Sequence, residues 1–200
     1  RLTTGVHNIA IGGTAMGGDP GPTTENHNLA IGVNSMGGNI AGGENNVAIG
    51  NYALDALTSG DFNTSLGYNA GSALTTGVRN VIIGSNAADA MTTGSSNVFI
   101  GDEAVGGGVQ TGSQNVAIGR NSGHDLTSAS ESTFVGFESG KDVTTSNYNT
   151  LIGMMSGQYI TTGDGRNTAV GLRNFNQGTA LTTGSNNIAL GERCKVSAAN

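Results

Sequence analysis

The sequence predicts an all-β fold, a single parallel β-solenoid in which one short repeat makes one coil. Three observations support this prediction: the 200 residues include 35 glycines and no tryptophan, only 11% are charged, and a short motif recurs along the chain. Disordered chains are usually rich in charge or proline, and this chain, with 2 prolines, is neither. A thin core repeated from coil to coil is therefore expected.

The repeat is marked by a glycine that closes a short apolar step. The residue before this glycine is always Ile, Leu or Val, and successive glycines lie 17 to 20 residues apart. A unit this short and regular is typical of a solenoid coil, and glycine with β-branched residues at this density disfavours helices. We predict one domain over residues 1–200 with eleven coils, centred on Gly12, Gly32, Gly50, Gly67, Gly84, Gly101, Gly119, Gly136, Gly153, Gly171 and Gly191.

An asparagine stands four residues before the repeat glycine in every coil except one, where Ser132 takes its place. Stacked asparagines can bond from coil to coil or cap a corner, so their common register favours a structural ladder over a glycan or metal site. The predicted ladder consists of Asn8, Asn28, Asn46, Asn63, Asn80, Asn97, Asn115, Asn149, Asn167 and Asn187.

Thr-Thr-Gly segments supply the predicted corners, as in residues 74–77 and 91–94. Charged residues fall at or near the corners, and none lies between the asparagine and the glycine of any coil. The corners are therefore expected in water and the strands away from it.

The strand between asparagine and glycine is apolar on both faces. We interpret its Val and Ile positions as the inside of the coil and its middle position as the outside. Ten of the eleven middle residues are apolar, so a partner should cover them, most simply two further copies around a three-fold axis. The expected contact residues are Ile82, Phe99, Phe134 and Leu151. A scattered stripe on a monomer and a cover from a missing segment are the alternatives.

The N-V-A-I-G step followed by a small residue resembles the head repeats of trimeric autotransporter adhesins. The longer T-T-G-x-x-N-x-A-I-G unit is similar to repeats of phage tail fibres and bacterial surface fibres. The resemblance covers Leu2 to Gly191 and implies a left-handed, trimeric β-roll that binds cell-surface or matrix ligands. The inserted Thr-Thr-Gly corner departs from the adhesin repeat, and neither the adhesin stalk nor its anchor is present in this sequence.

Other patterns in the sequence give weaker indications. The Thr-Thr columns resemble ice-binding arrays, but only one column can face water and both columns are interrupted. The aspartates occupy no shared offset, so a repeated calcium site is not expected. His7 and His27 share one offset in adjacent coils and can bind a metal, although that offset elsewhere carries ordinary corner residues. Cys194 stands at a small-residue position and is interpreted as a packed thiol.

No catalytic arrangement is predicted, and neither a cofactor nor a metal is required. The nearest paired carboxylates are Asp102 with Glu103 and Glu138 with Asp142, and the sequence offers no tryptophan to line a sugar groove. We therefore do not expect an enzyme.

We expect a structural fibre segment outside the cell, on a cell surface or on a virion, that associates with itself. Its end coils carry no cap, which fits either head-to-tail stacking or a segment cut from a longer repeat array. A head that binds a cell-surface glycan or receptor is the alternative, and an ice-binding solenoid a weaker one. The net charge of −6 disfavours nucleic acid, and no apolar run suits membrane insertion.

Overall fold

The computed structural model describes residues 5–18, 26–38, 40–163, 165–175 and 185–194. Within this part of the chain the fold is all-β, with eleven strands of three residues and no helix. The strands are β1 Ile9–Ile11, β2 Leu29–Ile31, β3 Val47–Ile49, β4 Thr64–Leu66, β5 Val81–Ile83, β6 Val98–Ile100, β7 Val116–Ile118, β8 Thr133–Val135, β9 Thr150–Ile152, β10 Thr168–Val170 and β11 Ile188–Leu190.

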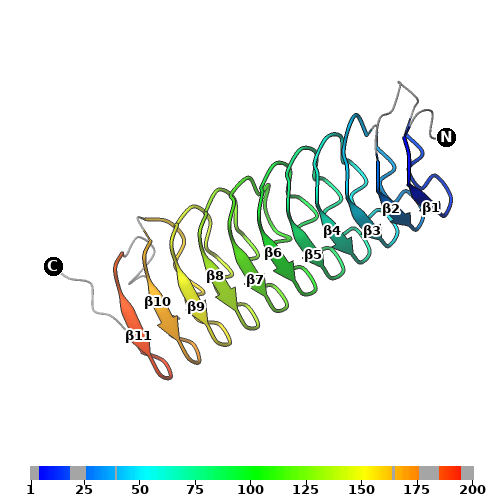
Figure 1. The fold of residues 1–200 in the computed structure, drawn as a ribbon. Helices are drawn as coiled ribbons and strands as arrows, with labels where there is room; N and C mark the ends of the chain where they lie inside the picture. Colours follow the sequence, from blue (N-terminus) through cyan, green and yellow to red (C-terminus); the bar gives the residue numbers. More distant parts are fainter. Residues whose placement is uncertain (1–4, 19–25, 39, 164, 176–184, 195–200) are drawn as a thin grey trace.

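All eleven strands form one parallel sheet in chain order, from β1 to β11. Equivalent repeat positions pair throughout, as when Ile82 of β5 faces Phe99 of β6. Figure 1 shows the result: the strands line one side of an elongated stack, with β1 and β11 at opposite ends, and turns return the chain on the other side. Eleven strands about 4.8 Å apart make a rod about 50 Å long. The predicted β-solenoid and its register are confirmed.

The repeat glycine ends each strand because no other residue fits there. Gly32 has a φ of 136°, and a Cβ on it would lie 2.5 Å from the carbonyl oxygen of Gly50 in the next coil. Gly119 repeats this geometry, with its Cβ position 2.6 Å from the oxygen of Gly136. Both the backbone conformation and the close approach of the next coil therefore require glycine.

The interior of each coil is narrow and is filled from two walls. The sheet contributes the middle residue of each strand, and the turn wall contributes residues three, four and seven positions after the repeat glycine. In the fifth coil these are Ile82 from the sheet and Ala87, Ala88 and Met91 from the turns, all fully buried. One apolar cluster of this kind runs along the rod from Met16 to Ala189.

Candidate interaction surface

The two faces of the sheet are the reverse of the expectation from sequence. The middle residues of the strands point into the coil, and the expected contact residues Ile82, Phe99, Phe134 and Leu151 have no exposed surface. They belong to the core of a single chain, so their assignment as an oligomer contact was wrong. The buried asparagine ladder lies on the same inner side, two residues before the middle position, as strand alternation requires.

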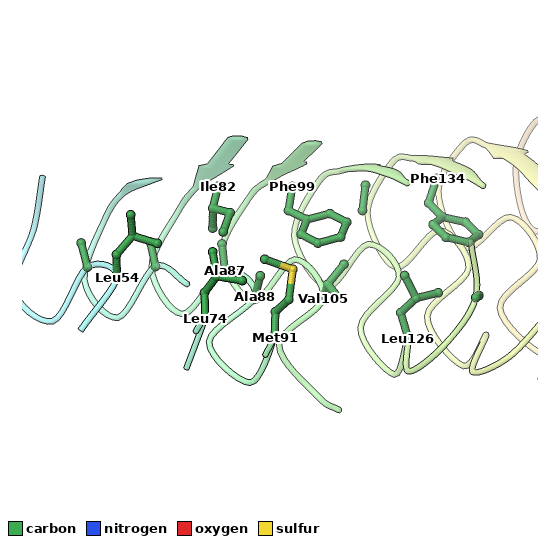
Figure 2. Close-up of a cluster of buried hydrophobic side chains, with 14 of the residues drawn as sticks. Leu54, Leu74, Ile82, Ala87, Ala88, Met91, Phe99, Val105, Leu126 and Phe134 are labelled. Atoms are coloured by element: carbon green, nitrogen blue, oxygen red, sulfur yellow. The ribbon is translucent and has the colours of Figure 1, made fainter. Parts of the chain in front are cut away.

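The narrow interior explains why the middle residues of the strands, and not the Val and Ile residues, point into the coil. The large side chains of the turn wall already occupy most of the interior. Where the turn wall contributes Leu54, the facing strand residue is Ala48. Where the strand contributes Phe134, the turn wall has Gly140, whose missing Cβ would lie 2.7 Å from Cε1 of the phenylalanine. Figure 2 shows both walls: Phe99 and Phe134 descend from the strands, whereas Leu54 and Leu126 rise from the turns.

The outward face of the sheet is formed by the first and third residues of every strand. The third position is apolar in all eleven strands, and the first is apolar or threonine. These side chains are partly to largely exposed: 44% of the Leu66 surface and 37% of the Ile118 surface is accessible. We call these residues the outer face; its third-position column is Ile11, Ile31, Ile49, Leu66, Ile83, Ile100, Ile118, Val135, Ile152, Val170 and Leu190.

Polar and aromatic side chains form a border beside the outer face. This border starts at the residue five positions before the repeat glycine. Arg79 lies over the ring of Phe62, with its guanidinium carbon 5.7 Å from the ring centre. Arg166 lies over Tyr148 in the same way, at 5.4 Å, five coils further along the rod. The charged residues of this border therefore lie beside an outer face that itself carries no charge.

The ten predicted asparagines form a ladder on the inner side of the sheet; eight are buried, and Asn8 and Asn187 in the end coils are partly exposed. In a typical link, the backbone N–H of Asn63 donates to Oδ1 of Asn46 at 2.9 Å, and the Asn63 amide donates to the Gly77 carbonyl at 2.9 Å. The amide also donates to Oδ1 of Asn46 at 3.1 Å. An aspartate would lack both donor bonds and would bury a charge, which accounts for asparagine at this position.

At Ser132 the ladder continues through a hydroxyl group. Ser132 Oγ accepts the N–H of Asn149 at 3.1 Å and donates to the Ser130 carbonyl at 3.2 Å. The amide of Asn149 then turns to the carbonyl of Ser146 in its own coil, at 2.9 Å. The ladder is a structural element, and from Asn28 to Asn167 its side chains are closed to ligands by burial.

The two threonine columns have different surroundings. The first threonine of each corner bonds to the next coil, as when Thr58 Oγ1 donates to the Thr75 carbonyl at 3.0 Å. The second residue of the corner is exposed, as at Ser59, Thr76 and Thr93. In these coils the first hydroxyl column is therefore half-buried and bonded to the next coil, and the second column is the more exposed one.

The paired carboxylates of the sequence lie on exposed or half-buried corners. Asp102 is 3.7 Å from Nε of Arg120, and Glu138 is 3.9 Å from Nζ of Lys141. Burial raises the pKa of the Asp142 carboxyl, and the nearby Asp125 charge raises it further. Pairs this exposed contribute little to stability. In the described part of the chain, no three His, Cys, Asp or Glu side chains gather as a metal site.

Two further predicted positions are half-buried or exposed single features. Cys194 packs partly against the apolar cluster, and its backbone N–H donates to Oδ1 of Asn174 at 2.8 Å. His7 and His27 stack with ring centroids 4.9 Å apart.

The sequence analysis did not predict the outer face because it assigned the Val and Ile positions of the strand to the interior. The signal that identifies the inner residues is the pairing of a large side chain at the strand position with a small one at the turn position, or the reverse.

Comparison of the chain with protein-family models, with curated proteins and with solved structures finds no match in any of the three. Among the residues that the structure describes, no helix has the length and apolar character needed to cross a membrane.

Proposed function

We propose that the chain is a non-enzymatic structural segment of an extracellular or virion fibre, a solenoid shaft that associates with further copies of itself through the outer face. The observation that supports this is the uninterrupted apolar third-position column, in which every member is Ile, Leu or Val. A monomeric soluble protein seldom exposes a continuous apolar strip along its whole length.

The size of the outer face fits an interface between copies. Eleven strands at about 4.8 Å, each three residues of about 3.3 Å wide, present a flat area of about 500 Å². The two bordering residues on each side extend this to about 1,200 Å², above the roughly 800 Å² per partner that a stable interface buries.

A second copy is the partner that best matches the regularity of this surface. Identical ladders present the same spacing, so two or three copies can align equivalent coils around a rotation axis and each buries the same residues. The simplest closed arrangement is a trimer, in which each sheet lies towards the common axis. The resemblance to trimeric surface and tail fibres supports the same arrangement.

The experiment compares assembly of the native sequence with two matched variants by analytical ultracentrifugation. The native chain is expected to sediment as a homo-oligomer, and Ile100→Lys, which places a charge in the third-position column, is expected to dissociate it. Thr93→Lys adds the same charge at an exposed corner and should leave assembly unchanged.

Electron microscopy of the native chain provides the second measurement. Oligomeric rods, alone or joined into fibres, would support the shaft. A native chain that stays monomeric at all accessible concentrations would overturn the proposal, as would an Ile100→Lys variant that is folded and still fully assembled.

A further inference from the structure

Two of the three histidines of the chain lie together at the β1–β2 end of the rod. His7 and His27 occupy the same repeat position and have nearly the same backbone conformation, with φ of 60° and 59°. Their rings are stacked, with centroids 4.9 Å apart and planes inclined by 22°. Both side chains are exposed, so solvent and ions reach them.

The backbone around the pair is held by bonds between the two coils. The N–H of His27 donates to the Val6 carbonyl at 3.1 Å, and the N–H of Val6 donates to Oδ1 of Asn26 at 2.9 Å. One residue further along, the N–H of Asn28 donates to Oδ1 of Asn8 at 2.9 Å. The backbone spacing of the two histidines is therefore set by the solenoid.

We propose that His7 and His27 form a binding site for a divalent transition-metal ion, with Cu²⁺ preferred and Zn²⁺ and Ni²⁺ bound less tightly. Neutral imidazole is the most common metal ligand in proteins, and a pair of imidazoles suits these ions. Among first-row divalent ions, affinity for such ligands is highest for Cu²⁺.

The distance between the rings is compatible with one shared ion. Two imidazole nitrogens bound to one metal at about 2.1 Å each lie at most about 4.2 Å apart. The ring centroids are 4.9 Å apart and the planes are inclined by only 22°, so both rings must turn until one nitrogen of each points at the same ion. Side-chain rotation provides this movement because both imidazoles are exposed at a corner. Water completes the coordination.

The third histidine provides an internal comparison. Nδ1 of His124 lies 2.6 Å from Oδ1 of Asp125, and no second imidazole stands at its repeat position in a neighbouring coil. A single imidazole with one carboxylate gives one strong nitrogen ligand, whereas the His7–His27 pair gives two. The metal site depends on one chain alone, so it is independent of the proposed self-association.

The test is calorimetric titration of CuCl₂, and separately ZnCl₂, into protein without an affinity tag and with Cys194→Ser, which removes the single thiol. One Cu²⁺ per chain is expected to bind, with weaker binding of Zn²⁺. His7→Ala or His27→Ala should weaken Cu²⁺ binding at least about tenfold, because loss of an outer-shell partner alone costs about 10–100-fold.

Two variants complete the experiment. His124→Ala should bind Cu²⁺ as tightly as the parent. Asn45→His places an imidazole beside His27 at the next position of the same column, where the backbone has the same conformation (φ of 58°), so the variant should retain binding when His7 is replaced by Ala. Equal affinity of the parent and a His7→Ala/His27→Ala double variant would overturn the site, as would an equal loss on His124→Ala.

Discussion

The third coil and the eighth coil enclose the same backbone but fill it from opposite sides. In the third coil, Ala48 of the strand faces Leu54 of the turn wall; in the eighth, Phe134 of the strand faces Gly140. Both turn residues have left-handed backbone conformations, with φ of 51° at Leu54 and 59° at Gly140. Such a conformation costs a leucine about 1–3 kcal/mol and costs glycine almost nothing. In these two coils a large side chain on one wall is therefore matched by a small one on the other, and the left-handed strain arises only where the turn wall supplies the large residue.

Neighbouring coils share this volume when one coil is small on both walls. The fourth coil has Ser65 in the strand and Gly71 in the turn wall. A Cβ on Gly71 would lie 3.1 Å from Leu54 Cδ2 of the preceding coil and 2.8 Å from Ile82 Cδ1 of the following coil. Large side chains on both sides thus extend into the space, and the cluster stays continuous.

The largest expected effect comes from removing the strand side chain where the turn wall has glycine. Phe134→Ala should lower the free energy of unfolding by about 3–5 kcal/mol, because neither Gly123 nor Gly140 has a side chain to fill the cavity. Urea denaturation at fixed protein concentration measures this loss. Phe62→Ala is the control: Phe62 is 53% exposed, and its loss should cost no more than about 1 kcal/mol. Similar losses in both variants would contradict the proposed filling.

The reverse change adds a side chain where the strand already fills the coil. Gly140→Leu should cost about 3 kcal/mol, from overpacking against Phe134 and from left-handed strain. Combined with Phe134→Ala, it recreates the pairing of the third coil, so the double variant should lose less than the sum of the two single losses by about 0.5–3 kcal/mol. Strict additivity in urea denaturation would show that the two walls do not share one volume.

The asparagine ladder gives a smaller effect, which differs between the fourth coil and the eighth. Asn63 takes part in bonds to Asn46, Gly77 and Asn80, whereas Ser132 in the eighth coil makes two bonds through its hydroxyl. Asn63→Ala should therefore cost about 1–3 kcal/mol, as buried groups lose their partners, and Ser132→Ala should cost less. Thermal unfolding followed by circular dichroism tests this order. An equal or larger loss of stability in Ser132→Ala would contradict it.

The smallest effect concerns the carboxylates that follow the two turn residues. Burial raises the pKa of Asp55 and of Asp142 above the ordinary value of 3.8, and at Asp142 the charge of Asp125 adds to the effect. The folded state therefore holds these protons more tightly than the unfolded state does. The contribution of these two carboxyl groups to folded-state stability is fully present below pH 3.8. It is lost as the pH rises through their pKa values in the folded state.

Replacing either carboxyl by an amide removes this loss at neutral pH. Asp142→Asn should raise the free energy of unfolding at pH 7 by no more than about 0.5 kcal/mol, because solvent screens a side chain this exposed. Asp55→Asn, which lacks the like-charge neighbour, should gain less. Melting temperatures at pH 7 and pH 3 provide the measurement, and a gain confined to pH 3 would have the wrong sign.

Periodicity in the sequence was sufficient to predict the coils, the parallel register and the ladder, because each depends on residues that recur at one offset. The orientation of the strand was not predictable in the same way. Val, Ile and Ala columns are all apolar, so alternation alone leaves two choices of inner face. Only the reciprocal sizes of pairs such as Ala48 with Leu54 and Phe134 with Gly140 identify the inner column. The residues assigned to the oligomer contact therefore lie on the predicted strands, but on the buried face of the sheet.

Pairing between consecutive coils also determines how the chain reaches this structure. Paired strand residues such as Val47 and Thr64 are 17 positions apart, and the sheet joins each strand only to its neighbours in the sequence. Over 200 residues this is a relative contact order of about 0.09, a value found in helical bundles that fold quickly rather than in other β-proteins. Each new coil can dock on the preceding one as soon as it is available, so the rod can grow in the order in which the chain is synthesised or exported.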